Sequence, residues 1–217
     1  LKVLTVTDID TLYQRRLQSL PQLCGLIADL QRARQGRYLV ALPSYEYLDH
    51  LSRSPDKPAN FIAQSPAMDE DEQLALLKQF QQSPAAVLGI VMGGVFAESV
   101  DLGTSTVAGV VVVSLGLPPT NLIRSLSVDY FNGAHGVGWG EQIAYLQPAM
   151  TRVVQAAGRL IRGPRDKGVI CLVDPRFADP TIAKFFPEHW QPEKMSANRV
   201  ESCLKAFWSN DLSQPED

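Results

Sequence analysis

Five valines stand within eight residues in the run Val107-Ala-Gly-Val-Val-Val-Val-Ser114. A run this apolar has no polar face, which predicts a strand buried on both sides. Shorter apolar runs recur elsewhere, at residues 37–42, 60–63, 85–91 and 168–174. Continuous apolar strands, as opposed to alternating ones, are typical of a parallel sheet covered by helices on both faces. We therefore expect an α/β fold.

Helical stretches separate these strands. Apolar residues recur at helical spacing in two places, namely Leu23, Leu26, Ile27 and Leu30 in the first, and Leu74, Leu77 and Phe80 over residues 69–82 in the second. Thr7 or Asp8 could cap a helix that runs through residues 13–16, and Pro21 is expected to interrupt it. Two later helices are expected near residues 121–132 and 146–162, separated by a flexible glycine loop over 133–140. The alternation predicts one domain over residues 1–217.

The charge of the chain gives no support to a nucleic-acid partner. Its net charge is −3 and its pI about 5.6, whereas a nucleic-acid-binding domain is often strongly basic. The basic residues would have to gather on one face, and they do form an early and a late cluster in the sequence. The clusters are Arg15, Arg16, Arg32, Arg34 and Arg37, then Arg152, Arg159, Arg162, Arg165 and Lys167.

Cysteine usage and hydropathy indicate the compartment. Cys24, Cys171 and Cys203 are far apart and show no CxxC spacing, which argues against a disulfide framework and fits a reducing compartment. Cys171 lies in an apolar run and is expected to be a buried thiol. No apolar run approaches the roughly 18 residues that a membrane span needs. The first residues contain neither an initiator Met nor a signal peptide, so we expect a piece of a longer chain.

Open α/β sheets carry functional residues where strands end, and three places are candidates. The first, Leu42-Pro-Ser-Tyr45, follows an apolar run. Ser44 is suited to cap the next helix, and a cap alone would explain it. The functional alternative is a turn whose backbone N–H groups, together with the Ser44 hydroxyl, bind a phosphate of single-stranded nucleic acid.

The second candidate is Val91-Met-Gly-Gly-Val-Phe-Ala-Glu-Ser-Val-Asp101. Gly93 and Gly94 would let a ligand or another backbone come close. Glu98 and Asp101 lie three residues apart and could share one face, although two solvated carboxylates on a turn would look the same. The phosphate-binding pattern GxxxxGK[ST] is absent, so this is not a P-loop.

The third candidate is Gln155-Ala-Ala-Gly-Arg-Leu-Ile-Arg162. On a helix Gln155, Arg159 and Arg162 form one stripe, and the small residues beside Gln155 let the helix pack closely. A solvated helix face is the plain alternative. Arginine, however, is the residue that neutralises the charge developing on a transferred γ-phosphoryl group.

These three elements together resemble the second motor lobe of superfamily 2 helicases of the DinG/XPD branch. Gln-x-x-Gly-Arg-x-x-Arg, then Asp-x-Gly and a strand ending in Asp-x-Arg-Phe, is similar to the last motor motif of that family, and Asp166, Gly168, Asp174, Arg176 and Phe177 complete it. The other two candidates resemble its Phe-Pro-Ser-Tyr and Gly-x-x-x-Glu-Gly-Val-Asp elements, in the family's order, over roughly residues 5–190. Ser99 stands where the family usually has Gly.

The resemblance implies a RecA-like parallel sheet and an ATP-dependent DNA helicase that acts on single-stranded DNA, as in DNA repair. Arg162 would be the arginine finger, Arg159 its companion at the phosphates and Gln155 a γ-phosphate sensor. The nucleotide-binding residues would also include Gly94, Glu98, Asp101 and Gly158. Ser44 and Tyr45 would face the DNA.

The same resemblance implies that the first motor lobe is missing from these 217 residues. That N-terminal lobe would be the partner that carries the phosphate loop and the ligands of Mg²⁺, and any iron–sulfur cluster would also lie in it. The chain alone is expected to be inactive, cytoplasmic and without membrane contact.

Three alternatives remain open. One is a helicase or translocase that acts on RNA. Another is a non-catalytic module that binds single-stranded nucleic acid or a protein. The third, a nucleotide-binding enzyme unrelated to helicases, would need an acid–base pair, but His50, His135 and His189 are isolated in the sequence.

Overall fold

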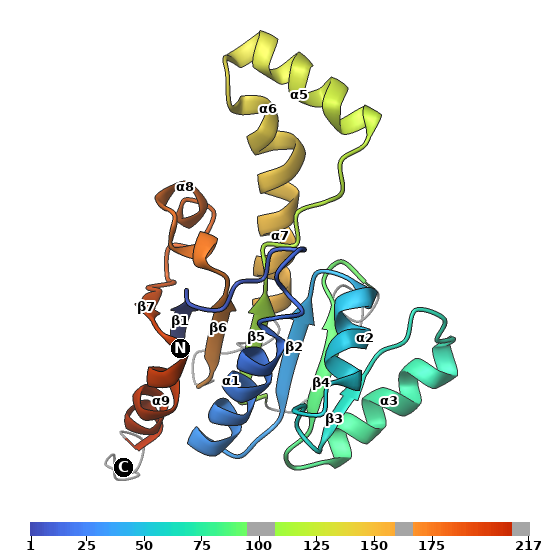
Figure 1. The fold of residues 1–217 in the computed structure, drawn as a ribbon, viewed down its shortest axis with the longest axis vertical. Helices are drawn as coiled ribbons and strands as arrows, with labels where there is room; N and C mark the ends of the chain where they lie inside the picture. Colours follow the sequence, from blue (N-terminus) through green and yellow to red (C-terminus); the bar gives the residue numbers. More distant parts are fainter. Residues whose placement is uncertain (95–106, 159–166, 210–217) are drawn as a thin grey trace, which may run out of the picture.

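The computed structural model describes residues 1–94, 107–158 and 167–209. Within these residues all strands join one parallel sheet of seven strands, in the order β3-β4-β2-β5-β6-β1-β7 (Figure 1). The strands are β1 (Lys2–Val6), β2 (Tyr38–Leu42), β3 (Phe61–Ala63), β4 (Val87–Val91), β5 (Gly109–Val113), β6 (Val169–Val173) and β7 (Glu193–Met195). The predicted α/β fold with a parallel sheet is confirmed.

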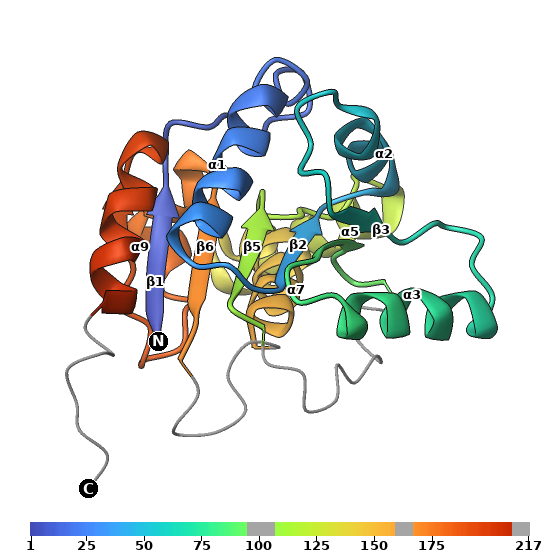
Figure 2. The same ribbon diagram turned by 90° about the horizontal axis from the view of Figure 1, so that it is seen from below.

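Helices cover both faces of the sheet. The α-helices in the described ranges are α1 (Leu20–Ala33), α2 (Tyr45–Arg53), α3 (Glu70–Gln82), α5 (Leu122–His135), α6 (Trp139–Glu141), α7 (Gln147–Ala157), α8 (Pro180–Ala183) and α9 (Val200–Ser209). A π-helical turn η1 (Gln142–Leu146) and two 3₁₀ turns, η2 (Pro175–Ala178) and η3 (Ala197–Arg199), complete the set. Figure 2 shows α1, α2 and α9 on one side of the sheet and α3 and α7 on the other.

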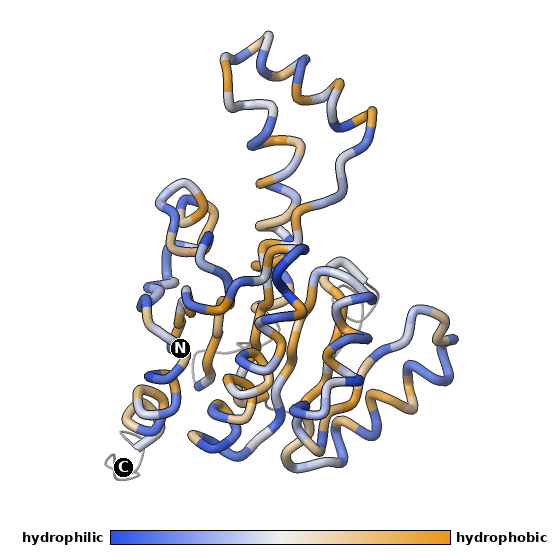
Figure 3. Tube along the Cα trace, viewed as in Figure 1, coloured by the Kyte–Doolittle hydropathy of each residue, from blue (hydrophilic) through white to orange (hydrophobic). Residues whose placement is uncertain are grey.

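The central strands are buried on both faces, as their apolar sequences predict. β2, β4, β5 and β6 have no exposed residue. Alternate side chains of each strand enter one of two apolar layers, so Val111 packs with α1 and α9 whereas Val110 packs with α7. Cys171 is fully buried, as expected. Figure 3 shows the apolar residues gathered along the strands.

The structure corrects three local expectations. Pro21 does not interrupt a helix; it lies in the first turn of α1, where its missing N–H costs nothing, and residues 13–19 form turns instead. Leu74 is 52% exposed, and the buried face of α3 consists of Leu76 and Phe80. The edge strand β7 and its neighbour β1 were not predicted.

A helical hairpin leaves the sheet after β5 and projects beyond it (Figure 1). It consists of α5, α6, η1 and α7, and most of the expected glycine loop over 133–140 is helical. No residue of α5 is buried, and its most exposed apolar side chains are Leu122, Ile123, Leu126 and Tyr130. The helix therefore has an uncovered apolar face.

Asp174 ties together the loops that follow three strands. Its fully buried carboxylate accepts hydrogen bonds from the Arg176 Nε (2.8 Å), from the Arg176 backbone N–H (2.8 Å) and from the Thr11 hydroxyl. Arg176 in turn donates to Ser114 Oγ at 3.2 Å, at the end of β5. The carboxylate also raises the pKa of the Arg176 guanidinium above its ordinary value.

Replacing Asp174 by Ala should lower the free energy of unfolding by about 3 kcal/mol, because it leaves a half-buried guanidinium without its buried counter-charge. Urea denaturation followed by circular dichroism measures this loss. Asp49→Ala is the matched control, since Asp49 pairs with Arg53 on the surface of α2. Equal midpoints for the two variants would refute the anchoring role.

Candidate functional site

The ends of β2, β3 and β4 bring two of the predicted site segments together. These three strands are neighbours, so the residues that follow them meet at the same edge of the sheet. Ser44 and Tyr45 follow β2, Gly93 and Gly94 follow β4, and Gln64 follows β3. Sequence reasoning did not single out Gln64.

Ser44 is the cap of α2, which was the plain reading of this residue. Its side chain accepts from the Tyr47 backbone N–H at 3.3 Å. Tyr45 is the first residue of α2, and its hydroxyl accepts a hydrogen bond from Gln64 Nε2 at 2.8 Å. Gln64 is 5% exposed, and its Oε1 has no hydrogen-bond partner in the described part of the chain. A buried acceptor left open beside Tyr45 is an unusual feature.

The two glycines after β4 separate Tyr45 from helix α7. A Cβ on Gly94 would lie 3.4 Å from Gln64 Nε2 and 3.7 Å from the Tyr45 hydroxyl oxygen. Gly93 faces the other way and has φ = 72°, a conformation that favours glycine; a Cβ there would come within 2.9 Å of Arg152 Nε. The turn therefore lies close to Gln64 and Tyr45 on one side and to Arg152 on the other.

Helix α7 carries the described part of the third candidate. Ala156 and Ala157 are buried against the sheet, so the small residues do let the helix pack closely, as expected. Gln155 is exposed, and Gly158 is the C-cap of α7. Gln155 and Arg152 line one open groove, and Gly93 touches Arg152. Arg152, three residues before the third candidate, thus lies beside the Gly93 turn and lines the same groove as Gln155.

The four charged candidates, Glu98, Asp101, Arg159 and Arg162, lie outside the described residues. The structure nevertheless fixes where their segments rejoin the fold, because residue 107 leads into β5 and residue 167 leads into β6. β5 and β6 are parallel neighbours, with Gly109 opposite Val169. The third candidate therefore leads into the amino end of a strand. The expectation that all three lie at carboxyl ends was wrong, because Gln155 precedes its strand.

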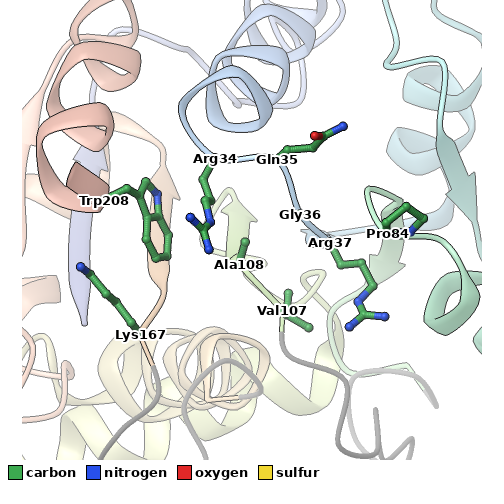
Figure 4. Close-up of a pocket in the computed structure, with 9 residues that line it drawn as sticks. All are labelled: Arg34, Gln35, Gly36, Arg37, Pro84, Val107, Ala108, Lys167 and Trp208. Atoms are coloured by element: carbon green, nitrogen blue, oxygen red, sulfur yellow. The ribbon is translucent and has the colours of Figure 1, made fainter. Parts of the chain in front are cut away.

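A pocket of about 320 Å³ lies where those two segments return to the sheet (Figure 4). Its lining is Arg34, Gln35, Gly36, Arg37, Pro84, Val107, Ala108, Lys167 and Trp208. The indole of Trp208 is flanked by the Arg34 guanidinium, 5.3 Å from the ring centre, and by the Lys167 amino group at 5.6 Å. Members of both basic clusters therefore gather at one edge.

Two arginines of the early basic cluster form contacts within the fold. Arg16 is 6% exposed, forms an ion pair with Glu46 and stacks on Tyr13 and Tyr47. Arg37 donates to the Gln81 carbonyl oxygen at 2.6 Å. In the described ranges no group of three or more His, Cys, Asp or Glu side chains could hold a metal ion.

Gln64 and Arg152 are the residues that sequence reasoning missed. Gln64 stands next to a weakly predicted strand, and nothing local indicates that it reaches Tyr45. Arg152 was visible only as a member of a basic cluster. Its place three residues before Gln155, on the same side of a helix, was the available signal.

Comparisons with known proteins identify the family of this chain. The sequence model of the family described as "Helicase C-terminal domain" matches residues 27–193. A probable ATP-dependent helicase of Methanocaldococcus jannaschii is 31% identical over 195 residues, which cover 82% of this chain and 29% of that protein. The ATP-dependent DNA helicase XPD of Sulfolobus acidocaldarius is 27% identical over 147 residues, 64% of this chain and 25% of the relative.

Solved structures give the same fold. An XPD helicase superposes with a TM-score of 0.69 at 20% identity, covering 89% of this chain and 35% of the other. The C-terminal domain of the DEAD-box protein Dbp5 gives 0.60 at 16% identity, covering 95% and 97%. The chain spans less than a third of the length of the two helicase relatives it matches in sequence.

Proposed function

This chain belongs to the family of helicase C-terminal domains, and we propose that it is the second motor lobe of an ATP-dependent DNA helicase. In the proposed protein a first lobe binds ATP and Mg²⁺, and this lobe closes on the nucleotide from the other side. Closure and reopening would move single-stranded DNA through the cleft. The whole of residues 1–217 would act as one domain.

One observation carries this proposal. The segment with Glu98 and Asp101 and the segment with Arg159 and Arg162 lead into neighbouring strands at one edge of the sheet. In our proposal residues of both segments bind the same nucleotide. In the proposal Arg162 is the arginine finger, Arg159 binds the phosphates, and Gln155, Gly158 and Gly94 complete the nucleotide contacts. Glu98 and Asp101 link the nucleotide to the DNA-binding side.

Ser44 and Tyr45 are proposed to contact the DNA backbone. The Ser44 side chain already accepts a hydrogen bond from a backbone N–H as a helix cap. A phosphate oxygen of DNA would therefore accept from the Ser44 hydroxyl or from a backbone N–H of the turn. The Tyr45 hydroxyl, fixed by Gln64, can donate its hydrogen to a phosphate oxygen.

Magnesium would be held by the first lobe, where it would neutralise charge on the phosphates. No described helix has the length and apolar composition that crossing a membrane requires. We propose that the whole protein acts in the cytoplasm and takes part in DNA repair.

The test is ATP hydrolysis by the two-lobed protein that contains this chain, with single-stranded DNA or RNA of the same sequence. Stimulation by DNA that clearly exceeds stimulation by RNA is expected. Preferential stimulation by RNA would replace the DNA helicase by an RNA-directed motor. Absence of hydrolysis with either polymer would reject the motor function.

A non-catalytic binding module is the second candidate, and the uncovered apolar face of α5 favours it. Leu122 and Ile123 are 74% and 75% exposed, and exposed apolar patches often mark protein contacts. This reading predicts a stable complex with a protein partner and no ATP hydrolysis in any form of the protein.

A further inference from the structure

An open groove of about 550 Å³ runs along the exposed side of α7 and the preceding turn. We call it the α7 groove; its lining is Ile143, Gln147, Pro148, Thr151, Arg152 and Gln155. This lining has one positive charge and no carboxylate. An anion in the groove would therefore meet a cation without like-charge repulsion from the groove's own residues.

Arg152 forms no ion pair within the described part of the chain. It is half-buried, and among the residues that the structure describes no carboxylate forms an ion pair with its guanidinium. The half-buried Arg176, by contrast, is paired with Asp174. A planar guanidinium with several free N–H donors is suited to binding carboxylate or phosphate oxygens in pairs.

The Gly93 turn gives the Arg152 side chain its position. A Cβ at Gly93 would lie 2.9 Å from Arg152 Nε and 3.3 Å from its Cδ, so any larger residue would push the side chain away. Arg152 is thus held between the end of β4 and the groove. It stands one helical turn from Gln155, so both side chains reach the same part of the groove.

We propose that the α7 groove receives phosphates of the nucleotide and that Arg152 is a phosphate-binding residue in addition to the two arginines of the motif. The inference rests on the proposed function, because it takes the nucleotide to lie against Gln155. It adds a site residue that lies outside the Gln-x-x-Gly-Arg-x-x-Arg pattern. Backbone phosphates of DNA have the same chemistry, so the experiment has to separate the two sources.

The test uses the two-lobed protein with Arg152→Ala, Arg152→Lys and, as control, Arg53→Ala, whose side chain is 79% exposed on α2. Calorimetry measures the Kd of a non-hydrolysable ATP analogue, and fluorescence anisotropy measures the Kd of single-stranded DNA without nucleotide. Losing a charged hydrogen-bonding group should raise the Kd of the analogue by roughly tenfold or more. Lys should restore part of the affinity, because it keeps the charge but not the paired donors.

Affinity for DNA alone should stay within about twofold of the control, a difference well under 1 kcal/mol. An unchanged Kd for the ATP analogue would overturn the inference, and so would a loss confined to DNA. If alanine destabilises the protein, Arg152→Gln gives the same comparison with a polar chain of similar length. Failure of the motor function itself would appear differently, as absence of ATP hydrolysis in the unmodified protein.

Discussion

Replacing Arg162 by alanine in the two-lobed protein should reduce the rate of ATP hydrolysis by roughly 10³–10⁵-fold. The reason is that an arginine finger stabilises charge that develops on the γ-phosphoryl group only in the transition state. Binding of ATP before the reaction should therefore change much less. Steady-state hydrolysis gives kcat, and calorimetry with a non-hydrolysable analogue gives the Kd.

Arg165→Ala is the matched control for this variant. Arg165 lies three residues further along the same segment, outside the family pattern, and belongs to the same basic cluster. Removing Arg165 tests whether the loss of any positive charge in this segment is enough to slow ATP hydrolysis. Turnover of the Arg162 variant within about tenfold of the unmodified protein, a barrier change of only ~1.4 kcal/mol, would refute the finger assignment.

The 217-residue chain alone should show no Mg²⁺-dependent ATP hydrolysis above the buffer rate. Its sequence has no GxxxxGK[ST] pattern, and its described residues offer no metal cluster. It therefore supplies arginines without the groups that hold the phosphates and the cation. The measurement compares the isolated chain with the two-lobed protein, each with and without single-stranded DNA.

Two controls make this result interpretable. A cooperative unfolding transition shows that the isolated chain is folded although it hydrolyses no ATP. The Arg162→Ala version of the isolated chain identifies contamination, because a contaminating ATPase would persist in it. Hydrolysis that the isolated chain performs and its Arg162 variant lacks would overturn the two-lobe proposal.

The parallel fold was predictable because its central strands are apolar on both faces. β5 and β6 are recognisable without tertiary information, since nothing in them can face water. The edge strands lack this signal. Glu193 and Lys194 of β7 are exposed, and backbone pairing with β1 defines the strand. Leu74 shows a second limit of sequence-based prediction. Helical spacing identifies an apolar face of a helix, but the packing of the helix on the sheet decides which side chains of that face are buried.

The candidate site was predictable where its interactions are local. Ser44 caps α2 by accepting from the backbone N–H three residues ahead, and the order of residue types reveals such a cap. Gln64 reaches Tyr45, and Arg152 reaches Gly93, only because β2, β3 and β4 lie together and α7 packs beside them. Such contacts depend on the order of the strands in the sheet, and the spacing of apolar residues in the sequence does not predict that order. The roles of Arg159, Arg162, Glu98 and Asp101 stay predictions from the family resemblance.

The pairing of the first strand has a consequence for how this lobe is made in the cell. Lys2 lies opposite Val169, and β1 separates β6 from β7. A ribosome that adds roughly 5–20 residues per second needs on the order of 10–30 s between those two residues. During that time Val3, Leu4 and Val6 have no partner strand, and an open apolar strand invites pairing with other chains. Nascent copies of this lobe should therefore depend on chaperones until β6 emerges.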